Sequence, residues 1–184
     1  MRIISGLYGG RVLKSPSHNR IRPTSDRLRE ALFNIISAQI EEDTKFLDLC
    51  AGTGAIGIEA LSRGCRSAIF VDVSRRACSL IEENLDLIKV PEEQTEVFCS
   101  SAEKYVAKNS DGNCDLIFYD PPYDHDYSNV LKSISEVDNN ILAKSGILIV
   151  EHFAKSVLPY EVGEIRRWRI LKQGETSVSF YEKN

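Results

Sequence analysis

The 184-residue chain has no long apolar run, no C-x-x-C pair and only three histidines. A membrane-spanning helix needs roughly 18 consecutive apolar residues, and residues 1–6 lack the apolar core of a signal peptide. We therefore expect a protein with no membrane partner that stays in the cytoplasm. The length allows one well-buried core but is short for two full domains.

The cysteines and histidines indicate neither disulfides nor a metal. The five cysteines are odd in number and none is paired at the spacing of a zinc or redox motif, which argues against a disulfide framework. His18, His125 and His152 show no metal-ligand spacing. We therefore predict no metal, and a reducing cytoplasm fits this composition.

The formal net charge of −4 hides a basic N-terminal end on an acidic body. Residues 1–40 hold seven Arg or Lys against two acidic residues, so they carry +5, whereas residues 41–184 carry −9. A basic block can steer a polyanion to one face of a protein that is acidic overall. A solvated surface would give the same excess, so the charge alone does not establish a nucleic-acid partner.

From residue 46 onward, apolar runs alternate with segments of helical periodicity, which is typical of a parallel sheet with helices on both faces. We expect strands at residues 46–50, 68–72, 95–99, 115–119 and 146–151. We expect helices at residues 55–61, 74–88, 102–107 and 128–142. Residues 165–171 and 177–181 predict a closing antiparallel hairpin.

Residues 1–45 differ in character from the rest of the chain. They contain two short extended pieces around Gly9 and Gly10, a polar loop, and a helix that Thr24 or Ser25 can cap. We therefore divide the chain into an N-terminal basic extension, residues 1–45, made of a short β-hairpin, a loop and a helix, and an α/β domain, residues 46–184.

Asp120, Pro121, Pro122 and Tyr123 directly follow the strand expected at residues 115–119. The carboxyl ends of parallel strands build the binding crevice of an open α/β sheet. The Asp120 carboxylate and a prolyl carbonyl can each accept one N–H of a planar exocyclic amine, while the Tyr123 ring stacks on the heterocycle. A Pro-Pro pair after a strand is equally typical of a plain turn, so these four residues leave both interpretations open.

Gly52, Gly54 and Gly57 form a G-x-G-x-x-G loop, and Asp72 ends the next expected strand. This is the fingerprint of a dinucleotide site, but S-adenosylmethionine uses the same turn. Asp48 distinguishes the two, because a carboxylate pointing at the loop would repel a pyrophosphate by about 1–4 kcal/mol. It would instead attract the cationic amino group of S-adenosylmethionine, directly or through water. S-adenosylmethionine is therefore the favoured cofactor.

Residues at the neighbouring strand ends complete the expected cofactor site. The Asp72 carboxylate would accept both ribose hydroxyls, and Glu103 or the Ala102 amide would contact the adenine edge. Taken singly, Asp48 and Asp72 could be ordinary strand-end carboxylates. The predicted cofactor-binding set is Asp48, Cys50, Ala51, Gly52, Gly54, Asp72, Val73, Ala102, Glu103 and Asp120.

Residues 46–64, joined to residues 120–123, resemble the class I S-adenosylmethionine-dependent methyltransferases that modify exocyclic amines. Residues 22–34, with residues 2–6 and Gly10-Arg11, are similar to the bacterial 16S ribosomal RNA guanine-N2 methyltransferases of the RsmD type. The resemblance extends from residue 2 to about residue 181. Two positions depart from the family pattern, because Cys50 stands where phenylalanine is usual and Asp72 where glutamate is frequent. Neither departure removes a group that the reaction needs.

The resemblance implies a Rossmann-like fold with a seven-stranded, mostly parallel sheet, a C-terminal antiparallel hairpin and a small N-terminal extension that binds substrate. It implies methyl transfer to the exocyclic N2 of a guanine in 16S rRNA, within an assembled or partly assembled 30S subunit. Asp120 and the Pro121 carbonyl would hold the amine, and Tyr123 would stack on the unstacked base. We expect a monomer. The expected RNA contacts are Arg11, Arg22, Thr24, Arg27 and Arg29.

Two other functions are compatible with the motifs. Adenine N6 is also an exocyclic amine, so a DNA adenine-N6 methyltransferase would use the same residues, although 184 residues leave little room for a DNA-reading module. An NAD-linked oxidoreductase would use the glycine loop, but Asp48 argues against it. Only the resemblance of residues 22–34 favours guanine over adenine.

Overall fold

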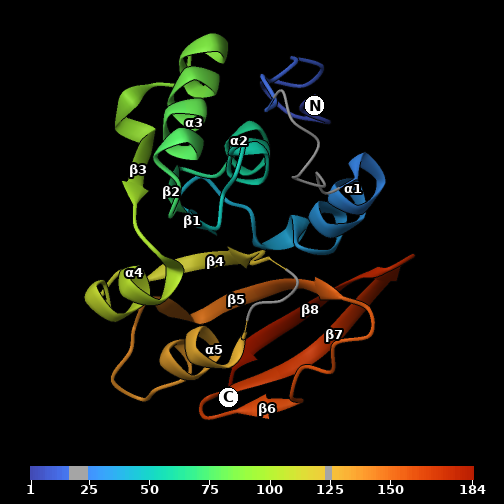
Figure 1. The fold of residues 1–184 in the computed structure, drawn as a ribbon, viewed down its shortest axis with the longest axis vertical. Helices are drawn as coiled ribbons and strands as arrows, with labels where there is room; N and C mark the ends of the chain where they lie inside the picture. Colours follow the sequence, from blue (N-terminus) through green and yellow to red (C-terminus); the bar gives the residue numbers. More distant parts are fainter. Residues whose placement is uncertain (17–24, 123–125) are drawn as a thin grey trace.

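The computed structural model describes residues 1–16, 25–122 and 126–184. In this part of the chain, eight strands form one mixed sheet with the order β3-β2-β1-β4-β5-β8-β7-β6 (Figure 1). The strands are β1 (Lys45–Leu49), β2 (Ser67–Asp72), β3 (Thr95–Cys99), β4 (Cys114–Tyr119), β5 (Leu142–Phe153), β6 (Glu161–Val162), β7 (Ile165–Gln173) and β8 (Thr176–Lys183). The helices are α1 (Asp26–Ile35), α2 (Ala55–Ser62), α3 (Arg75–Ile88), α4 (Ala102–Lys108) and α5 (Ser128–Ile134), with short 3-10 turns at Ser37–Gln39 and Glu92–Gln94.

The first five strands in this order are parallel, and β8, β7 and β6 continue the sheet in antiparallel pairs. Helices α1, α2 and α3 cover one face and α4 and α5 the other (Figure 1). Successive side chains of a strand point to opposite faces. In β1, Phe46 packs in the cluster beneath α1 and α2, whereas Leu47 and Leu49 pack beneath α4 and α5. The same alternation directs Asp48 toward the α2 face.

The parallel sheet and the closing hairpin expected from the sequence are confirmed, with two differences in detail. The helix expected at residues 128–142 is wrong beyond Ile134. There the Asn139 side chain accepts the Ile141 N–H at 2.9 Å, and such local side-chain bonds favour turns over helix. The two-residue strand β6 pairs with β7 and adds an eighth strand to the seven expected.

Residues 1–16, here called the N-terminal arm, lie against α2 and α3 (Figure 1). The arm folds back on itself through a bridge between Arg2 and Val12. Its apolar side chains Ile3, Tyr8 and Leu13 are buried in the same cluster as residues of the sheet and of α1. Among the described residues, no helix is long and apolar enough to cross a membrane.

Candidate functional site

The loop between β1 and α2 has a backbone that few side chains tolerate. Cys50, Gly52 and Gly54 have positive φ angles of 65°, 57° and 76°, a conformation that costs a non-glycine residue roughly 1–2 kcal/mol. A Cβ on Gly57 would lie 2.3 Å from the Phe70 ring, so glycine there allows α2 to pack closely on the sheet. The loop is therefore shaped to bring its backbone close to a ligand.

Asp48 lies beneath this loop and is almost completely buried. Its Oδ2 accepts the Gly57 N–H at 2.9 Å, which supplies the first turn of α2 with an acceptor that its N-cap residue, Gly54, cannot provide. Burial raises the pKa of Asp48 to about 7, and the charge of Asp72 acts in the same direction. The contact that the structure shows is thus to the helix, and the predicted contact with a cofactor amino group stays a prediction.

Asp72 joins the loop to the end of β2. Its Oδ2 accepts the Gly52 N–H at 2.9 Å and its Oδ1 accepts the Ser74 N–H at 2.8 Å. Each carboxylate oxygen has two acceptor sites, so both oxygens keep capacity for a ribose hydroxyl. Beside it, the Val73 side chain is 73% exposed. This exposed apolar surface lies at the same strand end as Asp72, where Val73 is one of the predicted cofactor residues.

The other predicted cofactor residues reach the same edge of the sheet. The Ser100 N–H donates to Asp72 O at 3.0 Å and thereby holds the start of α4, which carries Ala102 and Glu103, next to the end of β2. The Ala51 N–H donates to Val71 O at 3.0 Å. The structure therefore brings together the strand ends on which the predicted set depends.

Asp120 directly follows β4, and its N–H donates to Leu49 O at 3.3 Å. Tyr119 pairs with Val150 of β5, so Asp120, just after β4, lies near Glu151 of β5, whose charge acts on it. Burial raises the pKa of Asp120 well above its ordinary range, and the charges of Glu151 and Asp48 raise it further. Carboxyl groups whose pKa is raised by burial and by neighbouring charges occur frequently at functional sites.

The residues around Asp120 differ in what the structure describes. Pro121 is buried and Pro122 exposed. Tyr123 lies outside the described residues, so its stacking role stays a prediction. Glu151 was missed by the sequence analysis as a neighbour of Asp120, although it is the last residue of the strand expected at residues 146–151; in the structure β5 continues to Phe153. That position was the signal that could have identified it.

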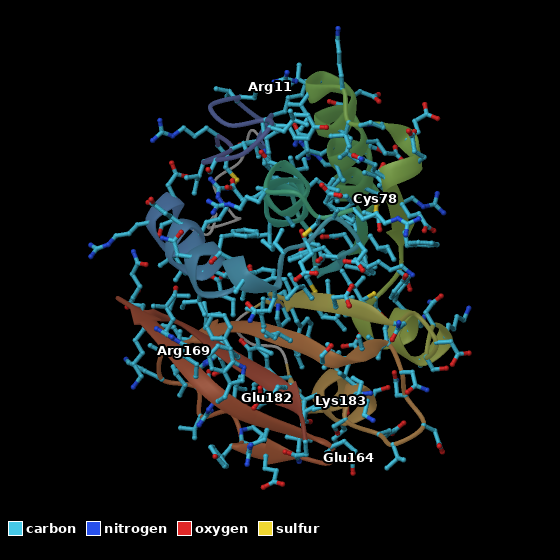
Figure 2. The ribbon with its side chains drawn as sticks, turned by 180° about the vertical axis from the view of Figure 1, so that it is seen from behind. Arg11, Cys78, Glu164, Arg169, Glu182 and Lys183 are labelled. Carbon is cyan, nitrogen blue, oxygen red and sulfur yellow. The ribbon has the colours of Figure 1, made fainter. Side chains whose placement is uncertain are left out.

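The predicted RNA contacts separate into three groups. Arg11 is exposed beside the end of α3 (Figure 2), where its guanidinium donates to Ile88 O and lies 5.4 Å from the centre of the Tyr8 ring. Arg27 is exposed on α1. Arg22 and Thr24 lie outside the described residues, and the side chain that caps α1 is that of Ser25, which accepts the Leu28 N–H.

For Arg29 the prediction of an RNA contact is wrong. Its side chain is fully buried, with Nη2 2.9 Å from Asp26 Oδ1 and Nε 3.9 Å from Glu59 Oε2. Burial lowers the pKa of Arg29, which the two carboxylates partly offset. A guanidinium enclosed in this way supports the packing of α1 on α2 and cannot reach a phosphate.

A cavity of about 350 Å³ is lined by residues that follow the Asp120 segment in the sequence. Asp126, Ser128 and Lys132 line it from the start of α5, and Ser156, Leu158 and Val162 from the segment that follows β5. Ligand pockets in proteins have volumes of roughly 300–1,000 Å³. No group of three or more potential metal ligands is found in the part of the chain that the structure describes.

Known proteins resemble this chain over nearly its whole length. The family model Conserved hypothetical protein 95 matches residues 1–182. Ribosomal RNA small subunit methyltransferase D of Haemophilus influenzae is 31% identical, and the alignment covers 98% of this chain and 91% of that protein. The Escherichia coli K12 protein of the same name is 31% identical, with 100% and 90% covered. A solved Escherichia coli structure, described provisionally as the methyltransferase yhhF, has a TM-score of 0.87 at 30% identity, with 100% and 98% covered.

Proposed function

We propose, from the premise that the chain belongs to the Conserved hypothetical protein 95 family, that it transfers a methyl group from S-adenosylmethionine to the N2 of a guanine in 16S rRNA. The resemblance to the RsmD-type enzymes is confirmed by the family match and by relatives named ribosomal RNA small subunit methyltransferase D. One observation carries the proposal: a ligand-binding glycine loop and an acceptor-bearing Asp120 segment share one edge of the sheet.

The described residues fit S-adenosylmethionine. Asp72 holds the loop through Gly52 and Ser74 and keeps acceptor sites for the two ribose hydroxyls. Gly52 and Gly54 present bare backbone, and the exposed Val73 offers apolar surface to the adenine. When bound, S-adenosylmethionine supplies the electrophilic methyl group, so the chain itself must supply orientation and acceptors.

The Asp120 segment would hold the amine. The N2 of guanine is a poor nucleophile because its lone pair is delocalised into the ring. If Asp120 and the Pro121 carbonyl each accept one N–H, the nitrogen can become tetrahedral and direct its lone pair out of the ring plane. Holding the amine in this geometry and placing acceptors where positive charge develops account for most of the rate. The departing proton passes to Asp120 or to water.

The N-terminal arm and α1 would contact the RNA. Arg2, Arg11, Lys14 and Arg27 place exposed cations on this side of the molecule, and phosphate contacts of this kind position a nucleic acid without reading its sequence. We propose that the substrate is an assembled or partly assembled 30S subunit and that the protein acts on it as a monomer in the cytoplasm.

Methyl transfer from labelled S-adenosylmethionine tests this function. The acceptors are 30S particles that lack the modification, naked 16S RNA and duplex DNA, followed by digestion to nucleosides. We expect label in N2-methylguanosine, with 30S particles the better substrate. Label that appears only in DNA adenine would exclude the RNA function and establish the adenine-N6 alternative.

A further inference from the structure

Asn84 of α3 is fully buried and contacts two functional segments with a single amide group. Its Oδ1 accepts the Lys14 N–H at 2.7 Å, and its Nδ2 donates to Lys14 O at 3.2 Å. The same Nδ2 donates to Thr53 O, in the glycine loop, at 2.9 Å. One side chain therefore links the backbone of the N-terminal arm to the backbone of the cofactor loop.

Other residues of the arm bond to α2, the helix that follows the glycine loop. Glu59 of α2 accepts the Ile4 N–H at 2.7 Å and the Ser5 N–H at 3.1 Å. A Cβ on Gly6 would lie 1.7 Å from Ser62 O, so the arm approaches α2 as closely as glycine permits. These contacts end at the body of α2. A direct contact between the arm and the loop joins two side chains, Thr53 Oγ1 and Met1 Sδ, at 3.8 Å. Among the described residues, the hydrogen bonds that link the backbone of the arm to the backbone of the loop pass through the Asn84 amide.

The two contacts of Asn84 depend on each other. An amide has two N–H donors, and Asn84 uses one on the arm and one on the loop. A donor left without a partner in a buried site is unfavourable. If Lys14 moves away from Asn84, the hydrogen bond from Asn84 to Thr53 O is therefore weakened. If the loop moves away from Asn84, the hydrogen bonds between Asn84 and Lys14 are weakened in turn.

We propose that Asn84 is a positioning residue that couples the arm to the cofactor loop, so that RNA bound to the arm and S-adenosylmethionine bound at the loop strengthen each other. The RNA half of this coupling rests on the proposed function. Lys14 lies at the junction, because Asn84 holds its backbone while its Nζ pairs at the surface with Glu83 at 2.9 Å. A phosphate can replace such an exposed ion pair at little cost. Linkage requires that the two ligands affect each other by the same factor.

The first test measures the affinity for S-adenosylhomocysteine with and without saturating 30S particles. We expect the particles to tighten binding about 5- to 10-fold in the native protein, a coupling of ordinary size. Asn84→Ala should abolish the effect. Asn139→Ala is the matched control, because Asn139 is also a buried asparagine that bonds to backbone, at Ile141 and remote from the arm. It should keep the native coupling.

A second variant removes the same contact from the side of the arm. Lys14→Pro removes the N–H that Asn84 accepts, whereas Lys14→Gln removes only the charge. We expect Lys14→Pro to lose the coupling and Lys14→Gln to keep most of it. If both Lys14→Pro and Asn84→Ala retain the native coupling, the proposal is overturned.

Amide hydrogen exchange gives a readout that needs no RNA. S-adenosylhomocysteine should slow exchange in residues 1–16 of the native protein and of Asn139→Ala about 5-fold or more, but not in Asn84→Ala. Equal protection in all three proteins, or none in the native protein, would refute the coupling. Failure of the native protein to bind or methylate 30S particles would instead contradict the proposed function, and the exchange result would still decide the role of Asn84.

Discussion

The cofactor edge of this molecule and the side that we propose to face RNA use their charged residues differently. At the cofactor edge, Asp48 and Asp72 bond to backbone N–H groups of the glycine loop and its helix, so each carboxylate both shapes the site and lies within it. On the side proposed to face RNA, the Arg29 guanidinium is buried in the core, and the exposed Arg11 donates to a carbonyl at the end of α3. Charged residues at the cofactor edge therefore hold the glycine loop and its helix, whereas Arg29 holds α1 against α2.

The largest effect is expected for Asp120, whose loss should reduce the rate of methyl transfer without reducing cofactor affinity. Asp120→Ala should lower kcat for methyl transfer about 10²- to 10⁴-fold, because the amine loses an acceptor and a proton acceptor. Affinity for S-adenosylhomocysteine should stay near the native value, as measured by calorimetry. Asp72→Ala is the contrasting variant and should lose cofactor affinity. An equal loss of affinity in Asp120→Ala would mean that the acceptor has been misplaced.

The next effect tests Asp48 as a buried carboxyl group. Its folded pKa of about 7 lies above the unfolded value of 3.8, so between these pH values the folded state binds the proton and the unfolded state does not. Stability from this group is therefore present at pH 4 and lost as pH rises to about 7. The difference approaches about 4 kcal/mol.

Asp48→Asn isolates this effect, because asparagine keeps an oxygen for the Gly57 N–H and cannot ionise. Urea unfolding from pH 4 to pH 9 should show the native protein losing stability relative to the variant between about pH 4 and pH 7, and parallel curves above that. Parallel curves over the whole range would show that Asp48 is ionised in the folded protein.

A third effect tests the buried role of Arg29. Arg29→Ala should destabilise the fold by about 3 kcal/mol, because it removes one partner of a buried ion pair and leaves Glu59 partly uncompensated. Urea denaturation measures this loss. RNA affinity of the folded variant should be unchanged, and a selective loss of RNA affinity with native stability would contradict the buried placement.

Helical spacing in the sequence could have revealed that Arg29 is buried. Arg29 lies three residues before Leu32 and four before Phe33, both buried, so the periodicity of α1 places it on the apolar face. Its partner Glu59 is 30 residues away on α2, and nothing local in the sequence links the two. The glycine loop and Asp72 were predictable because one short strand-loop-helix motif determines their geometry. Asn84 was not, because an asparagine among the apolar positions of α3 carries no signal of what it touches.

The end of α5 was also not predictable from the local sequence. Apolar periodicity continues past Ile134 in the sequence, but the chain turns where Asn139 bonds to Ile141 and then enters β5. The carbonyl groups of residues 140 and 141 also accept hydrogen bonds from the N–H groups of Asn113 and of Cys114, the first residue of β4. Contacts between segments distant in sequence therefore decided this boundary, whereas the strands, whose apolar runs are continuous, were predicted to within a few residues.

The smallest effect tests whether the exposed side of α1 contacts RNA. Arg27→Ala removes an exposed cation, so stability should change by no more than about 0.5 kcal/mol. If Arg27 contacts a phosphate, affinity for 30S particles should fall severalfold, and the slope of log affinity against log salt should decrease by about one. Glu30→Gln is the control. It removes an exposed negative charge from the same helix and makes the net charge one unit more positive, so it should not weaken binding. An unchanged salt slope in Arg27→Ala would remove α1 from the RNA interface and leave the arm as the contacting segment.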